Sequence, residues 1–242
     1  MQAFTDKNVL ITGASRGLGR ALFEGFARAG GRSVGVARGS AELRAVAEAL
    51  RARGLDAHAL PADIGDANAI YPLAGAAQAL VGPIDILIHD ASTLGPTPLR
   101  PLLDTECEDF ARVLEVNLLG PFRLSKALAG GMVVRRRGVI VNVSSDAATS
   151  AYPNWGAYGV SKAALDHLTR SWAAELAGSG VIAVSADPGE MDTLMHRDAL
   201  PDADPATLAA PSDVAAGLMR WIARLTPADS GRRATPADWG QP

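Results

Sequence analysis

Residues 8–19 read NVLITGASRGLG, and this stretch decides how the chain folds. Residues 8–11 form a short, largely apolar run of the kind expected in a strand buried on both faces. Glycines follow at Gly13, Gly17 and Gly19, and a segment of helical period begins at Gly17. A strand that passes through a tight glycine turn into a helix is the opening unit of a parallel α/β sheet.

The same alternation continues along the chain. Short apolar runs predict strands at residues 8–11, 33–36, 57–60, 84–88, 139–143 and 181–185. Segments of helical period predict helices at residues 17–29, 40–53, 67–80, 106–134, 155–177 and 212–225, with Ser212 capping the last and Gly120-Pro121 bending or splitting the fourth. Repeated β-α units give right-handed crossovers. We therefore expect a single domain over residues 1–242, a Rossmann-like, doubly wound three-layer αβα sandwich with a mostly parallel sheet of six to seven strands.

Composition excludes several classes of protein. The chain has 242 residues, 48% hydrophobic and 20% charged, which is typical of a globular protein. With 23 basic and 26 acidic residues it lacks the basic excess of a nucleic-acid binder. No apolar run approaches the roughly 18–20 residues of a membrane span. The single cysteine, Cys107, lies in an acidic stretch that disfavours a thiolate, and residues 1–10 do not resemble a signal peptide, so we expect a cytoplasmic protein.

The glycine turn suggests a cofactor. Gly13, Gly17 and Gly19 would allow a tight turn, a close approach of backbone to a diphosphate, and close packing of helix on strand. The amino end of the following helix would offer free N–H groups to the phosphates. The alternative is a tight turn without a ligand, but its place after the first strand favours dinucleotide binding.

The end of the second strand indicates which dinucleotide. An acidic residue there would bind the ribose hydroxyl of NAD(H), whereas an arginine accommodates the phosphate of NADP(H). The segment VGVARGS, residues 34–40, has no acid and contains Arg38, while Arg16 can approach from the glycine turn. Both could instead be solvated arginines. The pattern favours NADP(H), with NAD(H) possible.

Tyr158 and Lys162 are four residues apart in a predicted helix and therefore share one face. An ammonium about 4 Å from a phenol contributes on the order of 4 kcal/mol at an effective dielectric near 20, or roughly three pKa units. We expect such a pair to lower the tyrosine pKa toward neutrality for general acid–base catalysis. By spacing alone, an exposed Tyr and a solvated Lys would be the better explanation of the pair.

Taken together, the motifs resemble the short-chain dehydrogenase/reductase family from residue 8 to about residue 225. The resemblance rests on residues 12–19, Asp63-Ile64, Ala91, Asn117, Ser145, Tyr158-x-x-x-Lys162 and Pro188-Gly189-x-x-x-Thr193, with Ser145 thirteen residues before Tyr158. It implies hydride transfer between a nicotinamide and a carbonyl or alcohol. Tyr158 would be the general acid/base, Lys162 would lower its pKa, Ser145 would polarise the substrate oxygen, and Asn117 would hold a water in the proton relay.

The resemblance and the turn residues together define an expected cofactor site. Its residues are Gly13, Ser15, Arg16, Gly17, Leu18, Gly19, Arg38, Ser40, Asp63, Ile64, Asp90, Ala91, Ser92, Val116, Tyr158, Lys162, Pro188, Gly189, Met191 and Thr193. For the substrate we expect Leu94, Ser145, Tyr152, Trp155 and Leu194, with Pro153, Asn154 and Met195 nearby. This lining suggests an apolar or aromatic carbonyl compound. Residues 190–206 resemble a short lid, and His196 and Asp192 lack further ligands at metal spacing, so no metal site is expected.

Two stretches depart from the family pattern. His89-Asp90-Ala91-Ser92 stands where the family has Asn-Asn-Ala-Gly, and an ionised Asp90 accepts hydrogen bonds but cannot donate them. Asp90 must therefore find a donor, become protonated or cost stability, and His89 is either its partner or a buried neutral imidazole. The segment after Leu225 is short and polar and contains Pro236, so a seventh strand there should be brief or absent.

For the assembly, we expect a homodimer through the helices at residues 106–134 and 155–177, with tetramers no more than equally favoured. The alternative to an enzyme is a non-catalytic NADP(H)-binding redox sensor or scaffold. The set Asn117, Ser145, Tyr158 and Lys162 argues against that alternative, whereas His89-Asp90 is its best support.

Overall fold

The computed structural model describes residues 4–240 of the chain; residues 1–3 and 241–242 of the expected domain lie outside the described part. Seven strands form one sheet, all parallel, in the order β3-β2-β1-β4-β5-β6-β7. The strands are β1 (Asn8–Thr12), β2 (Arg32–Ala37), β3 (Ala57–Pro61), β4 (Ile86–His89), β5 (Gly138–Val143), β6 (Val181–Ala186) and β7 (Arg233–Ala234). The six strands expected from apolar runs are present, with ends shifted by two residues at most.

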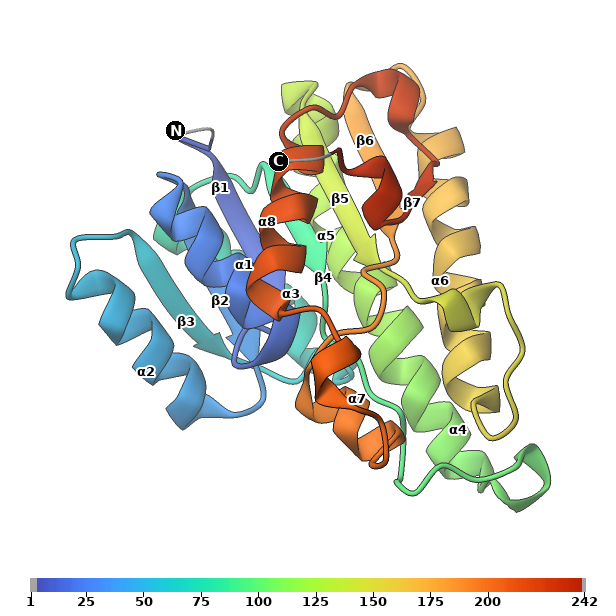
Figure 1. Ribbon diagram of the computed structural model, residues 1–242. Coiled ribbons are helices and arrows are strands. Elements are labelled where there is room, and N and C mark those ends of the chain that lie inside the picture. Colours follow the sequence, from blue (N-terminus) through green and yellow to red (C-terminus); the bar gives the residue numbers. More distant parts are fainter. Residues whose placement is uncertain (1–3, 241–242) are drawn as a thin grey trace.

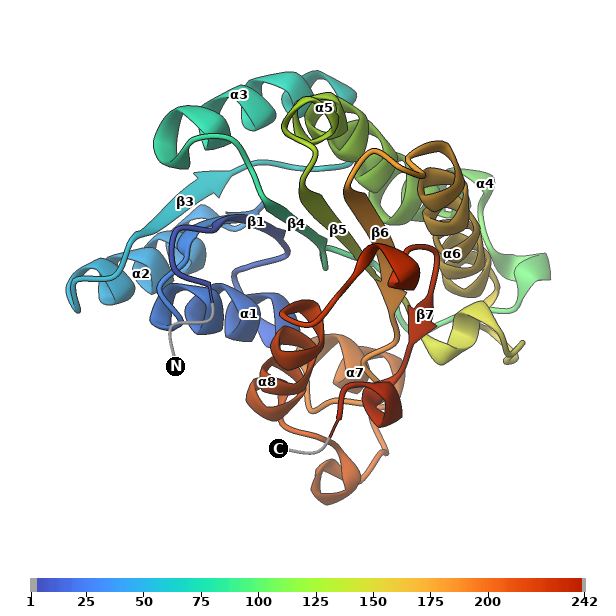
Figure 2. The same cartoon turned by 90° about the horizontal axis from the view of Figure 1, so that it is seen from above.

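Helices cover both faces of the sheet (Figure 1). They are α1 (Gly17–Arg28), α2 (Ser40–Arg51), α3 (Ile70–Val81), α4 (Cys107–Leu114), α5 (Gly120–Arg135), α6 (Gly156–Glu175), α7 (Leu194–Ala199) and α8 (Pro211–Ile222). Figure 2 shows α1, α2 and α8 on one side, with α3, α4, α5 and α6 on the other. The predicted Rossmann-like sandwich is confirmed.

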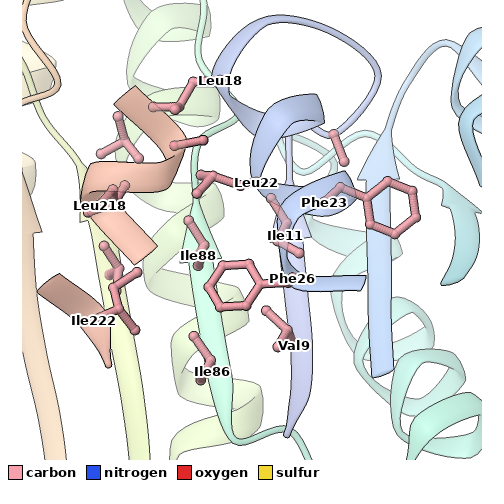
Figure 3. Packing of buried hydrophobic residues seen from close by; sticks show 14 of the residues in the cluster. Val9, Ile11, Leu18, Leu22, Phe23, Phe26, Ile86, Ile88, Leu218 and Ile222 are labelled. Carbon is pink, nitrogen blue, oxygen red and sulfur yellow. The ribbon is translucent and has the colours of Figure 1, made fainter. Parts of the chain in front are cut away.

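On the α1 side of the sheet, apolar side chains spaced at the helical period form one buried layer. Leu22, Phe23 and Phe26 lie on the buried face of α1 and are fully excluded from solvent. Leu22 and Phe26 pack against β1 and β4, Phe23 lies over Gly35 of β2, and Leu218 of α8 completes the layer (Figure 3). Burying each such side chain stabilises the fold by about 1.5–3 kcal/mol, so this layer holds the glycine turn, which immediately precedes α1, firmly against the sheet.

One local prediction was wrong. Ser212 is not the cap of α8: Pro211 occupies the first helical position, which makes Ala210 the N-cap residue, and no side chain caps the helix. The fourth helix is split as expected: a π-helical turn over Glu115–Leu119 separates α4 from α5, which begins at Gly120. Pro121 has no N–H to donate, and the helix widens just before it.

The C-terminal segment forms the brief seventh strand that its sequence allowed. Two residues of β7 pair with β6, through Ser185 with Arg233 and Ala186 with Ala234. Beyond it, Trp239 is buried and packs close to Gly217 of α8. The end of the chain therefore closes over α8. Within residues 4–240, no helix combines the length and apolar character needed to cross a bilayer.

Candidate active site

A cleft of about 1220 Å³ opens at the carboxyl ends of the strands. Its walls come from the segments that follow six of them, including Gly13 after β1, Arg38 after β2, Asp63 after β3, Ala91 after β4 and Ser145 after β5. The segment after β6 completes the wall with Pro188 and Gly189, and α7 lies beyond these strand ends (Figure 1). A ligand site at this edge, where strand order reverses between β1 and β4, is what the topology predicts.

The glycine turn closes tightly against the segment after β4. Gly13 has a φ of +78°, and a Cβ on it would lie 2.8 Å from the backbone nitrogen of Ala91. Only glycine fits this approach. Arg16, the N-cap residue of α1, makes no capping hydrogen bond with its side chain, which leaves the N–H groups of Gly17 and Leu18 available to an anion, whereas that of Gly19 is donated to Asp90.

Two arginines at this end of the cleft are free for a ligand. Arg16 and Arg38 both line it, and neither guanidinium forms an ion pair or side-chain hydrogen bond within residues 4–240. By contrast, the Asp63 carboxylate is already bound: it accepts from the Gly65 N–H at 2.9 Å and from Arg112 Nη2 at 2.5 Å. Arg112 was not expected from the sequence, because it is 49 residues from its partner.

Most of the expected cofactor residues line this single cleft. Lining residues are Gly13, Ser15, Arg16, Gly17, Leu18, Arg38, Asp63, Ile64, Asp90, Ala91, Ser92, Val116, Tyr158, Lys162, Pro188, Gly189, Met191 and Thr193. Two expected residues do not line it. Gly19 lies behind the turn against the Asp90 carboxyl, and Ser40 begins α2, whose Glu42 lines the cleft instead.

The structure resolves the alternatives for His89 and Asp90. His89 does not bind Asp90: its Nε2 is 2.9 Å from Ser125 Oγ, and burial lowers its pKa to about 3, so the imidazole is neutral. Asp90 accepts a hydrogen bond from the Gly19 N–H. Burial nevertheless raises the pKa of Asp90 to about 7, with Lys162 opposing the rise, so the carboxyl holds a proton over much of the acidic range.

Tyr158, Ser145 and Lys162 meet at the middle of the cleft. The Tyr158 and Ser145 hydroxyls share a hydrogen bond, and Lys162 Nζ lies 5.5 Å from the centroid of the Tyr158 ring. Lys162 Nζ donates a hydrogen bond of 2.7 Å to the carbonyl oxygen of Val143, the last residue of β5. Spacing on α6 and the end of β5 thus bring the three predicted side chains together.

The expected lowering of the Tyr158 pKa is wrong for this structure. Burial raises the pKa of Tyr158, and Asp90, Asp146 and Asp187 raise it further, whereas the hydrogen bond to Ser145 lowers it. Burial also lowers the pKa of Lys162 to about 8. The physical reason is that burial opposes charge on both groups at once, and neighbouring carboxylates disfavour a phenolate.

Asn117 is buried behind the cleft and does not line it. It sits in the π-helical turn, and its Oδ1 accepts from the Thr93 N–H at 2.8 Å. Its Nδ2 donates to the Thr93 carbonyl at 2.9 Å and to Ser161 Oγ at 3.0 Å. Asn117 therefore ties the segment after β4 to α6, the helix that carries Tyr158.

The substrate end is apolar and aromatic, with carboxylates at its mouth. All five expected residues line it, namely Leu94, Ser145, Tyr152, Trp155 and Leu194, together with Pro153 and Met195. Asn154 was expected there but lines a separate, much smaller cavity. The Asp146 carboxylate, next to Ser145, was missed by sequence reasoning. It accepts hydrogen bonds from Ser145 Oγ at 2.9 Å and Tyr152 Oη at 2.8 Å.

Arg233 of β7 was also missed. Its Nη2 donates hydrogen bonds to the Ser145 carbonyl oxygen and to Asp187, both 2.8 Å long. Its Nε donates a hydrogen bond of 3.0 Å to Asp166 of α6. Both carboxylates are buried. No local sequence pattern predicts this network, because its members come from four segments distant in sequence: β7, α6 and the residues that follow β5 and β6.

The fold and the cleft define the class: a Rossmann-like α/β protein with a ligand site at the carboxyl edge of its sheet. A family model described as short chain dehydrogenase matches residues 7–204. The chain belongs to the short-chain dehydrogenase/reductase family.

The chain is similar to individual members of this family. It is 36% identical over 190 residues to a short chain dehydrogenase of Pseudocercospora fijiensis. The match covers 77% of this chain and 60% of that protein, which is less than two thirds of its length. It is 35% identical over 190 residues to 2,3-dihydro-2,3-dihydroxybenzoate dehydrogenase of Bacillus subtilis, covering 78% of this chain and 72% of that one. The solved structure of a short chain dehydrogenase of Escherichia coli CFT073 in complex with NADPH superposes with a TM-score of 0.90 at 26% identity. The superposition covers 98% of this chain and 99% of that one.

Proposed function

We propose that this protein is an NADP(H)-dependent oxidoreductase that interconverts a carbonyl compound and its alcohol, acting as one cofactor-binding and catalytic domain. The observation that carries the proposal is the meeting of Tyr158, Ser145 and Lys162 in the same cleft as the glycine turn. In reduction Tyr158 would donate its proton to the substrate oxygen, and Ser145 would hold that oxygen. Lys162 would keep the site positive as the proton leaves.

The residues present fit a nicotinamide dinucleotide. Gly13 leaves a cradle that a Cβ would fill, and the first two residues of α1, Gly17 and Leu18, line the cleft beside it. Arg16 and Arg38 would hold a ribose phosphate, which supports NADP(H) over NAD(H), as does the NADPH complex of the Escherichia coli neighbour. When bound, the cofactor supplies the hydride, and the protein supplies orientation and the proton.

The apolar substrate end supports an aromatic or aliphatic carbonyl compound as the partner of this cofactor. Trp155 packs edge-on against Tyr158 with ring centroids 5.6 Å apart, which leaves an aromatic wall beside the reacting oxygen. The experiment is to titrate the protein with NADPH and NADH and then follow NADPH absorbance with a panel of aldehydes and ketones. Tight NADPH binding without turnover of any substrate would instead support the redox-sensor alternative.

We further propose a homodimer through α5 and α6. Val134 of α5 is 84% exposed, Val160 of α6 is 48% exposed, and Phe122 is 37% exposed where it stacks on Trp172. Apolar side chains on two adjacent helices suit a self-complementary interface. Sedimentation equilibrium should give twice the chain mass, and a single monomeric species would contradict the interface.

A further inference from the structure

The two ends of the cleft differ in their charged residues. The cofactor end holds the guanidinium groups of Arg16 and Arg38 together with Glu42 and Asp63, and Asp63 is paired with Arg112. The substrate end holds carboxylates, Asp146, Glu190 and Asp198, and no lysine or arginine lines it beyond Lys162, which donates to the Val143 carbonyl. Asp90 and Asp187 also line the cleft and act on Tyr158, and His196 lies at the mouth with its Nε2 3.7 Å from Glu190.

Asp146 is in direct contact with Ser145, the residue proposed to hold the substrate oxygen. Its Oδ1 accepts from the Ser145 hydroxyl at 2.9 Å and from the Ala147 N–H at 2.8 Å, and its Oδ2 accepts from Tyr152 at 2.8 Å. Partial burial raises the pKa of Asp146, but these hydrogen bonds outweigh it and leave the pKa below its usual value. The side chain is therefore ionised at neutral pH and fixed at the mouth.

The nearest strong cation does not cancel this charge. Arg233 lies behind Ser145 and donates to its carbonyl oxygen, but the guanidinium is shared between Asp166 and Asp187. Glu190 adds a second negative charge, which acts on the Tyr152 hydroxyl. A charged group bonded to the substrate carbonyl would thus meet a negative field.

We propose that Asp146 is a specificity-determining residue, which disfavours carbonyl compounds with an anionic group next to the reacting carbon and favours uncharged or cationic ones. This rests on the proposed function, because it assumes that the carbonyl binds at Ser145. It separates the protein from the Bacillus subtilis relative, whose name specifies a benzoate as substrate. Like charges brought together in a binding site are the usual device for rejecting a competitor.

The test compares three ketones that share a phenyl ring: phenylglyoxylate, its methyl ester, and phenacyl trimethylammonium. Because they differ in intrinsic reactivity, the quantity measured for each is the ratio of kcat/KM in Asp146→Asn to kcat/KM in the wild type. Relative to the ester, we expect this ratio to rise roughly tenfold for the anion and to fall for the cation at low salt. The same ratio for all three ketones would overturn the proposal.

Two controls separate charge from other effects. Glu48→Gln removes one negative charge from the exposed face of α2, outside the cleft. Its kcat/KM should equal that of the wild type for each of the three ketones. Tyr152→Phe removes the hydrogen bond to Asp146 Oδ2 but keeps the carboxylate, so discrimination by charge should persist. If Tyr152→Phe lost as much discrimination between the anionic and the uncharged ketone as Asp146→Asn does, the effect would come from the position of the loop and not from charge. That result would overturn the proposal.

Binding distinguishes failure of this inference from failure of the proposed function. Isothermal titration calorimetry of the same three compounds, with and without NADPH, needs no turnover. If none is reduced, the proposed function fails, while weaker binding of the anion that is relieved in Asp146→Asn still supports charge selection. Equal affinity of wild type and variant for the anion would reject it.

Discussion

The Arg233 guanidinium donates a hydrogen bond of 2.8 Å to the main-chain carbonyl of Ser145, 88 residues away in the sequence. The same side chain binds Asp187 at the end of β6 and Asp166 on α6. Because Asp166 is one helical turn beyond Lys162, one arginine ties together the segments that carry Ser145, Lys162 and the Pro188-Gly189 turn. The two-residue strand β7 therefore contributes to the site although it does not line the cleft.

Replacing Arg233 should damage both stability and turnover. Arg233→Ala leaves two buried carboxylates without their cation, and breaking such a pair costs about 3–5 kcal/mol. We expect a loss of roughly 3 kcal/mol in the free energy of unfolding, measured by urea denaturation, and a fall in kcat because Ser145 loses its support.

Arg232→Ala is the matched control. Arg232 pairs with Asp229 and Asp238 at the surface, where ion pairs contribute about 0–1 kcal/mol. If Arg233→Ala proved no more destabilising than Arg232→Ala, the network would have no structural role.

Asp90 should make stability depend on pH. Its folded pKa of about 7 lies above the ordinary 3.8, so between those values the folded state binds more protons than the unfolded state and stability falls as pH rises. Asp90→Asn keeps an acceptor for the Gly19 N–H and removes the ionisation. We expect the free energy of unfolding of the variant, relative to that of the wild type, to increase from pH 4 to pH 7. At pH 7 the increase should be about 2–4 kcal/mol, because each pKa unit corresponds to about 1.4 kcal/mol.

Urea denaturation of both proteins across pH 4 to pH 8 measures this difference. The gap should stop growing above pH 7, where both states of the wild type are ionised. A gap that stays constant with pH would mean that Asp90 is ionised throughout, and hence that the buried carboxyl is stabilised by a partner other than Gly19.

Arg38 should set the choice of dinucleotide. Arg38→Ala removes a guanidinium that lies at the cofactor end without a hydrogen bond or close ion pair in residues 4–240, so we expect NADPH affinity to fall roughly 10- to 100-fold. NADH affinity should change less than threefold, because NADH lacks the ribose phosphate. Fluorescence titration measures both constants, with Arg44→Ala, an exposed residue of α2 outside the cleft, as the control. An equal loss for the two cofactors would place Arg38 elsewhere than at the ribose phosphate.

Sequence reasoning reached the sheet and most of the cleft because both depend on local pattern. The buried strands read as apolar runs, and ligands of a parallel sheet lie at strand ends, so Gly13, Arg38 and Ser145 could be placed without coordinates. Where the fourth helix is interrupted could be read only approximately. A proline predicts irregularity, but which turn widens depends on the packing around Asn117.

What could not be predicted depends on distant residues. The spacing of Tyr158 and Lys162 indicates that they share a face, yet the direction of the Tyr158 pKa depends on burial and on carboxylates from three other segments. Arg233 stands in a stretch that reads as a polar tail, and its partners become visible only once β7 pairs with β6. Departures such as His89-Asp90 were recognised as unusual, but their protonation follows from packing.

The most direct test of the proposed chemistry is Tyr158→Phe, which deletes one oxygen from a buried ring and leaves the rest of the cleft in place. NADPH affinity and turnover with the best substrate of the panel are measured on the same preparation. The proposed role predicts cofactor affinity within threefold of the wild type and a loss of at least about a hundredfold in kcat, the usual contribution of a positioned acid. Turnover retained in the variant would contradict Tyr158 as the proton donor.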